Sequence, residues 1–192
     1  MLKKTLRSSA VLALVAAVAA PAGAASATAP PGAATGTAAT GFASSLKGEA
    51  RLAYEVTTEQ VRVTVDAHSV YHQGSIPVRS WGTFRISHVV DGRDYWGDLK
   101  VDCLTTGGPT ATVTGRLVRT SPGHPWIDTL GLGTRMGVSF LVPEDGPARA
   151  GLSGGTAKGK PLLTKCMAPA ADMAITEGGY TLHDRVARQP AG

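Results

Sequence analysis

Histidines are the residues of this sequence whose side chains could carry chemistry near neutral pH. There are five: His68, His72, His88, His124 and His183. His68 and His72 have the spacing of two metal ligands on one helix face, but the punctuation by Gly and Pro that follows them predicts a loop. His88 shares the parity of the apolar Phe84 and Ile86 near the end of a predicted strand. It is therefore either a hydrogen-bonded histidine that lines the interior or an acid–base group.

One serine lies in a pattern typical of nucleophiles. Gly151-Leu152-Ser153-Gly154-Gly155 fits G-x-S-x-G, but a nucleophile elbow needs a preceding strand and a following helix. Here the surrounding residues predict a Gly-rich loop. We assign no catalytic residue and interpret His88 and His183 as a possible interior polar site.

Acidic residues give two weaker patterns. Asp98 and Asp102 share a strand parity with Lys100, which places the two carboxylates roughly 13 Å apart on one face. Paired glycosidase carboxylates lie closer, at about 5 to 9.5 Å, so a solvated face is predicted. Asp91, Asp94 and Asp98 do not have the spacing of an EF-hand loop. We predict no metal site and no cofactor.

Strands must position these residues, and their pattern is clearest between residues 81 and 119. Residues 82–89 and 95–104 each alternate apolar and polar side chains, and Asp91-Gly92 between them is a turn pair that accepts positive φ. The alternation resumes over residues 111–118. Three consecutive antiparallel strands are therefore predicted.

The remaining pattern completes an all-β chain. Further strands are predicted at residues 46–56, 61–67, 135–142, 162–166 and 175–184. Glu144–Lys160 is predicted to be a long loop, of a length that is usually functional or mobile. About seven or eight strands without helical crossovers predict a single antiparallel β-barrel or β-sandwich. Glycines within strands favour the barrel slightly, because they can mark tight bends; these are Gly82, Gly97, Gly115 and Gly137.

The start of the chain has the pattern of an export signal. Lys3, Lys4 and Arg7 precede an apolar run over residues 10–20 and small-residue cleavage sites. That run is shorter than the roughly 20 residues of a membrane span, so no stable membrane span is expected after cleavage. The predicted organisation is a secretory signal peptide over residues 1–27, a flexible Ala/Pro/Thr/Gly-rich arm over 28–41, a secreted β-domain over 42–184 and a frayed tail over 185–192.

Charge gives little reason to expect a nucleic-acid partner. The formal charge is +5, but three of the 19 basic residues belong to the signal, so 16 remain against 14 acidic residues. The 16 remaining basic residues are spread from Lys47 to Arg188, whereas nucleic-acid binding usually needs a basic patch or stripe.

Cys103 and Cys166 are the only cysteines. An even count in an exported chain favours a disulfide. A redox or metal role is the weaker alternative, because the sequence has no Cys-x-x-Cys pair and no third soft ligand nearby.

Several of these segments resemble a group of small secreted actinobacterial proteins that are often labelled repetin-like. The resemblance rests on Gly82-Thr83-Phe84, His88, residues 97–104, Cys166 and residues 180–184. It implies secretion, a β-fold and the disulfide, and it implies no activity for any residue.

Two functions from different classes follow. The first is a secreted non-catalytic β-domain that binds a small apolar ligand or an extracellular protein partner. The second is a small secreted enzyme, a hydrolase or a barrel cyclase, that uses histidine and aspartate from separate strands. The enzyme requires an interior pocket that holds His88 or His183 with a carboxylate within hydrogen-bond reach.

Overall fold

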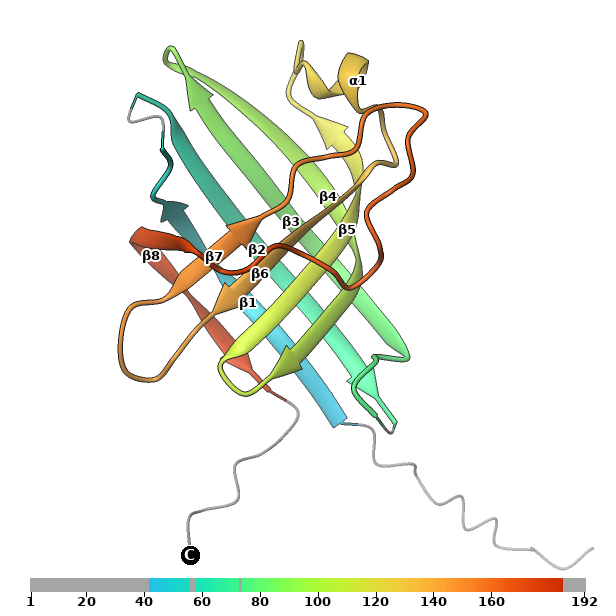
Figure 1. Ribbon diagram of the computed structural model, residues 1–192, viewed down its shortest axis with the longest axis vertical. Coiled ribbons are helices and arrows are strands. Elements are labelled where there is room, and N and C mark those ends of the chain that lie inside the picture. The colour runs from blue at the N-terminus through green and yellow to red at the C-terminus, as the bar shows by residue number, and fades with distance from the viewer. Residues whose placement is uncertain (1–41, 56–57, 73, 185–192) are drawn as a thin grey trace, which may run out of the picture. The chain divides into compact units, whose positions relative to one another are not determined.

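A computed structural model describes residues 42–55, 58–72 and 74–184 of this chain. These residues form eight antiparallel strands that pair in chain order, and the pairing of β1 with β8 closes the sheet into a ring (Figure 1). The all-β prediction is confirmed. The strands are β1 (Phe42–Leu52), β2 (Gln60–Tyr71), β3 (Arg79–Val90), β4 (Arg93–Gly107), β5 (Thr110–Thr120), β6 (Arg135–Leu141), β7 (Arg149–Leu152) and β8 (Met173–His183). The predicted signal peptide, arm and tail lie outside the described residues.

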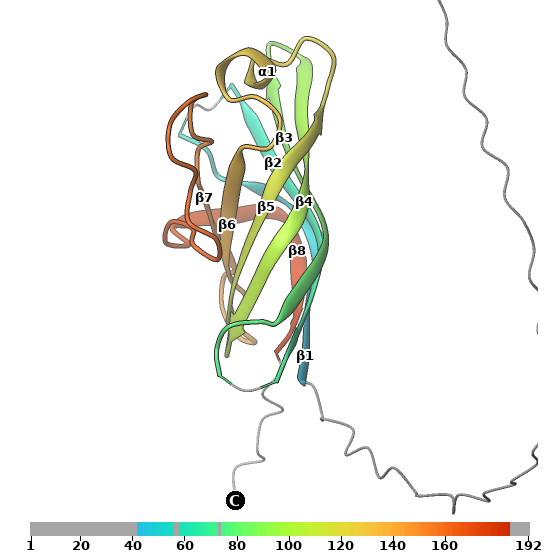
Figure 2. The same cartoon turned by 90° about the vertical axis from the view of Figure 1, so that its right-hand side faces the viewer.

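The ring is not a regular barrel, because its strands share ladders of very different length. β1 pairs with β2 over all of Phe42–Leu52. β7 and β8, in contrast, pair only at Arg149 with Ala174 and at Ala150 with Met173. We call this short contact the seam. In the side view, β1 to β4 form one wall of the ring, and β6 and β7 form the opposite wall (Figure 2).

The two ends of the ring differ. One end carries the single short helix of the described residues, α1 (Trp126–Thr129), together with the β3–β4 turn (Figure 1). We call it the helix end. At the opposite end, which we call the terminal end, β1 begins and β8 finishes. No helix within the described ranges is long and apolar enough to cross a membrane.

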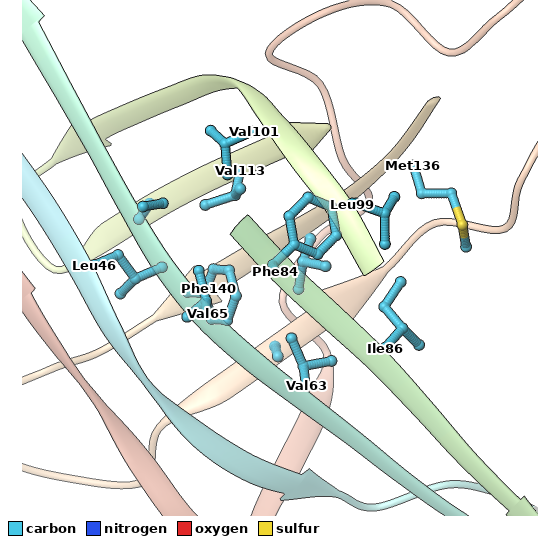
Figure 3. Packing of buried hydrophobic residues seen from close by; sticks show 14 of the residues in the cluster. Leu46, Val63, Val65, Phe84, Ile86, Leu99, Val101, Val113, Met136 and Phe140 are labelled. Carbon is cyan, nitrogen blue, oxygen red and sulfur yellow. The ribbon is translucent and has the colours of Figure 1, made fainter. Parts of the chain in front are cut away.

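Apolar side chains of one strand parity fill the interior of the ring. Phe84, Leu99 and Phe140 are almost fully buried there (Figure 3). Their neighbours are mainly β-branched and leucine side chains, which pack well between pleated strands; they include Leu46, Val63, Val65, Val113 and Val138. Each such side chain contributes roughly 1.5–3 kcal/mol when it leaves water. This alternation is the reason that the sequence forms strands with one buried face.

The three predicted central strands are confirmed as β3, β4 and β5. Asp91 and Gly92, at φ values of 50° and 74°, make the predicted tight turn between β3 and β4. One detail of parity is wrong. The pairing of β4 with β5 shifts by one residue between Val101 and Cys103. Cys103 therefore pairs with Thr114, whose hydroxyl donates a hydrogen bond to Asp102 on the outer face. Cys103 lies on that outer face and not in the interior, where its predicted parity had placed it.

The chain between β7 and β8, residues 153–172, is a long segment that we call the strap. It runs along the outside of the ring, past β6 (Figure 2). Cys166 on the strap is joined to Cys103 by the predicted disulfide, and the Arg135 guanidinium donates a 2.7 Å hydrogen bond to the Leu163 carbonyl oxygen. The predicted strand at 162–166 is therefore wrong. Its backbone bonds to side chains of the sheet instead of extending the ladder.

Two other predictions need correction. The predicted loop Glu144–Lys160 contains β7, a strand of only four residues. Two of the predicted bend glycines instead allow other groups to approach closely. A Cβ atom at Gly97 would lie 2.7 Å from the Trp126 ring, and one at Gly137 would lie 2.5 Å from the Met167 carbonyl oxygen of the strap.

Candidate functional site

A pocket of about 300 Å³ lies at the helix end of the ring. Apolar side chains from β2, β3, β6, β7 and β8 make most of its wall: Val61, Ile86, Met136, Leu152 and Met173. Three polar side chains also line it, those of Tyr54, His88 and Ser153. Ligand sites commonly combine apolar walls with a few polar groups in this way. We call it the helix-end pocket.

His88 is the histidine that lines this pocket, as its parity on β3 predicted. Its Nε2 atom lies 2.5 Å from the Glu59 carboxylate, which comes from the residue before β2. The two side chains are 31% and 22% exposed, respectively. The Tyr54 ring meets the imidazole edge-on, with 5.4 Å between ring centroids. A carboxylate in this place holds the imidazole ring in one orientation.

A cluster of three aromatic rings lies on the α1 side of the pocket, and one of them, Trp126, lines it. Tyr95, the cross-strand partner of His88, meets the His124 ring edge-on at 5.5 Å. His124 in turn packs 4.4 Å from Trp126, whose indole lines the pocket and lies over Gly97. Backbone hydrogen bonds position this segment: the Ser121 N–H donates to the Trp96 carbonyl oxygen and the Trp96 N–H donates to the Ser121 hydroxyl.

His124 itself is buried and neutral. Burial lowers the pKa of His124 below its ordinary value, and the nearby His88 lowers it further. Its Nδ1 accepts a hydrogen bond from the Trp126 N–H at 3.1 Å, so the ring proton is on Nε2. That Nε2 atom is buried and has no hydrogen-bond partner among the described residues.

The buried His124 makes stability depend on pH. Its folded pKa lies below that of the unfolded chain, so below about pH 6.5 the unfolded chain binds more protons. We expect the free energy of unfolding to fall with acid there, by at most about 1.4 kcal/mol per pH unit from this residue. Urea denaturation from pH 8 to pH 5 measures this. The slope should be smaller in His124→Phe, and equal slopes in the two proteins would contradict the assignment.

Ser153 lines the pocket but is not placed as a nucleophile. It follows β7 directly, yet the strap and not a helix comes after it. Its hydroxyl oxygen accepts a 2.7 Å hydrogen bond from the Gly137 N–H, and its own N–H donates to the Gly137 carbonyl oxygen. These bonds join the start of the strap to β6. The G-x-S-x-G pattern thus has a structural explanation.

The structure does not bring His183 and His88 together. His183 is exposed on β8 at the terminal end. It pairs with Ser45, which pairs with His68 on β2, whereas His88 pairs with Val61. The seven-residue offset along β2 corresponds to roughly 23 Å. His183 is therefore not part of an interior polar site with His88.

Of the two histidines predicted to lie in a loop, His68 has a different setting and His72 does not. His68 lies on β2 and not in a loop, where it bonds Asp66 at 2.7 Å and stacks on Trp81. His72 is exposed just beyond that strand. Within the described part of the chain, no three His, Cys, Asp or Glu side chains are grouped as metal ligands.

Asp98 and Asp102 of β4 belong to ion pairs on the outer face, not to a solvated face. Asp98 accepts hydrogen bonds from Arg85 and from Arg119, and the shortest distance to each guanidinium is 2.6 Å. These bonds, the one from Arg85 most strongly, hold the pKa of the Asp98 carboxyl below its ordinary value. Asp102 bonds Arg135 at 2.8 Å. A larger outer groove, of about 790 Å³, runs past Asp98. Its acidic groups already have basic partners, so we favour the helix-end pocket.

Comparison with known proteins adds no relative: the chain matches no known family model, no curated protein and no solved structure. The fold therefore defines only the class, a small all-β domain with one disulfide, whose sheet closes into a ring.

Two residues of the pocket region had no clear signal in the sequence. Glu59 lies in the connection between β1 and β2, and Trp126 lies in a segment between predicted strands. Tyr54 belonged to the predicted strand at residues 46–56, but β1 ends at Leu52 and Tyr54 lies in the connection that follows it. A large aromatic residue beside Pro125 in a polar connection was the one available hint, since such a side chain tends to find a buried position.

Proposed function

We propose that this protein is an exported, non-catalytic binding domain that holds a small and mainly apolar molecule in the helix-end pocket. The observation that carries the proposal is the pocket itself, with five apolar side chains around a single accessible imidazole. Its volume of about 300 Å³ is at the lower end of the range of roughly 300–1,000 Å³ for ligand sites. A ligand of this site is therefore small.

Export is part of the proposal. The signal-like pattern of residues 1–27 supports it, and so does the disulfide between Cys103 and Cys166, since disulfides persist mainly in oxidising compartments. A binding domain that works outside the cell must hold its structure at low concentration and without its partners. A covalent link between the sheet and the strap serves that requirement.

Filling the pocket tests the proposal. In Leu152→Trp the larger side chain enters the helix-end pocket, and we expect affinity for small apolar probes such as p-xylene to fall at least tenfold. Protein-observed NMR titration measures the affinity. Native mass spectrometry of the protein from culture supernatant would show, in parallel, whether a bound molecule of defined mass is lost in the variant.

Ile76→Trp is the matched control. It adds the same indole ring at residue 76, whose side chain is 73% exposed and lies outside the helix-end pocket. It should bind p-xylene as the unchanged protein does. Equal binding by Leu152→Trp and Ile76→Trp would contradict the proposed site, and no binding of p-xylene by the unchanged protein would contradict the proposed function.

A second candidate function is supported by the His88–Glu59 pair. A carboxylate that orients a histidine beside an apolar pocket is also the arrangement of a general base, although here the carboxylate is glutamate and not the predicted aspartate. An enzyme would change the bound molecule. Incubation of the protein with the molecule recovered from it distinguishes the two functions: an unchanged mass supports binding, and turnover that is lost in His88→Gln supports catalysis.

A further inference from the structure

The imidazole of His88 offers only one nitrogen to a ligand. Its Nε2 lies 2.5 Å from a Glu59 carboxylate oxygen. An ionised carboxylate can only accept hydrogen bonds, so Nε2 must carry the proton. In the neutral ring the other nitrogen, Nδ1, is then a hydrogen-bond acceptor. Glu59 thus determines the polarity of the group that the pocket presents.

This acceptor is available. Within the described residues no hydrogen bond reaches Nδ1 of His88, and the His88 side chain is 31% exposed and lines the pocket. Two nearby acceptors already receive a hydrogen bond from the protein: the Ser153 hydroxyl oxygen accepts one from the Gly137 N–H, and Nδ1 of His124 accepts one from the Trp126 N–H. A ligand among the apolar walls that reaches Nδ1 of His88 therefore meets an acceptor that lacks a donor.

We propose that the ligand of the helix-end pocket is a small apolar alcohol or phenol, whose hydroxyl group donates a hydrogen bond to Nδ1 of His88. This inference rests on the proposed binding function and adds the chemical class of the ligand. The indole of Trp126 lines the same pocket and provides a surface for an aromatic ring. Glu59 is a positioning residue, which acts on the ligand only through the tautomer of His88.

Protonation of His88 must abolish this preference, because Nδ1 then becomes a donor. The titratable groups that face His88 are Glu59 and Tyr54 from the β1–β2 connection, Tyr95 on the paired strand β4, and His124 from the segment before α1. Of these, Glu59 is the acidic one.

Two probes of nearly equal shape test the inference: p-cresol, which has a hydroxyl donor, and 4-methylanisole, in which a methyl group replaces the donor hydrogen. At pH 8 we expect the protein to bind p-cresol roughly tenfold more tightly, the effect of one net hydrogen bond. The comparison uses the unchanged protein, so it does not depend on whether a variant folds.

Variants then assign the effect to its residues. His88→Phe should bind both probes with the same affinity at pH 8. Glu59→Ala should keep its affinity for 4-methylanisole and lose about twofold in affinity for p-cresol, because only part of its imidazole rings then carry the proton on Nε2. A long-range ¹H–¹⁵N spectrum of the imidazole should show the Nε2-protonated tautomer of His88 in the unchanged protein and a mixture of tautomers in Glu59→Ala, which a purely structural role of Glu59 would not produce.

The outcomes separate this inference from the function on which it rests. Equal affinity for the two probes at pH 8 would overturn the hydroxyl preference and leave the binding site standing. The same holds for a preference that persists in His88→Phe. Failure of p-xylene, p-cresol and 4-methylanisole alike to bind the unchanged protein would overturn both proposals.

Discussion

Replacement of both cysteines by alanine should lower the free energy of unfolding by up to about 4 kcal/mol. Cys103 and Cys166 are separated by 63 residues, and in the chain-entropy model a cross-link over a loop of this length restricts the unfolded chain by about that amount. This is a large part of the net stability of a typical domain, about 5–15 kcal/mol. Urea denaturation of the double variant measures the change.

The double variant is needed because a single replacement leaves a free thiol. Reduction of the unchanged protein is the matched control, since it breaks the same bond without altering the sequence. The two measurements should agree to within about 1 kcal/mol. A loss below about 1 kcal/mol in both would show that the hydrogen bonds of the strap, such as that from the Cys166 N–H to the Thr114 hydroxyl, hold it without the covalent link.

Phe84→Ala is expected to have an effect of similar size, about 3–5 kcal/mol. Phe84 is 2% exposed at the centre of the ring (Figure 3). Its ring also takes the space of a side chain at Gly115, where a Cβ atom would lie 2.7 Å from the Phe84 ring. Loss of the phenyl ring therefore leaves a cavity that Gly115 has no side chain to fill.

Phe84→Leu is the control for that measurement, because it keeps most of the apolar volume and should cost less than about 1.5 kcal/mol. Both variants can be compared by urea or thermal denaturation. If Phe84→Ala and Phe84→Leu were equally stable, the packing described for the interior of the ring would be wrong.

Alternation of side chains predicted the central strands well. In β3 the alternating residues Phe84 and Ile86 face the interior, and His88 lines the pocket. The turn at Asp91-Gly92 was equally predictable, because few residue pairs accept two positive φ values. Where a strand is long and half buried, period-two patterning and turn chemistry carry enough information to assign it.

The strand predictions failed where contacts between residues far apart in the sequence, and not the local alternation of side chains, determine the structure. β7 has only four residues, with Ala150 and Gly151 at its centre, and neither side chain signals a strand. Residues 162–166 contain apolar side chains, but the disulfide and Arg135 hold them against the outside of the sheet. The register shift at Cys103 has no local signature and reverses the parity that follows it.

The pocket was predictable only in part. The parity of His88 indicated its inward position, whereas Glu59 comes from a connection 29 residues earlier in the chain, and only the pairing of β2 with β3 brings them together. The alternation of the sequence could have shown that His183 does not belong to an interior site. Tyr180 and Leu182 pack against the core, so the alternation of β8 places His183 outside.

The closure of the ring has a consequence for how the chain folds. β1 is the first strand and its second neighbour, β8, is the last, so this ladder forms only after the whole domain is available. Until then β1 and β7 are open sheet edges, and open edges pair readily with other chains. Contacts between residues so far apart in sequence also fold slowly. The period before β8 docks is therefore when neighbouring copies of this chain compete most strongly with correct folding.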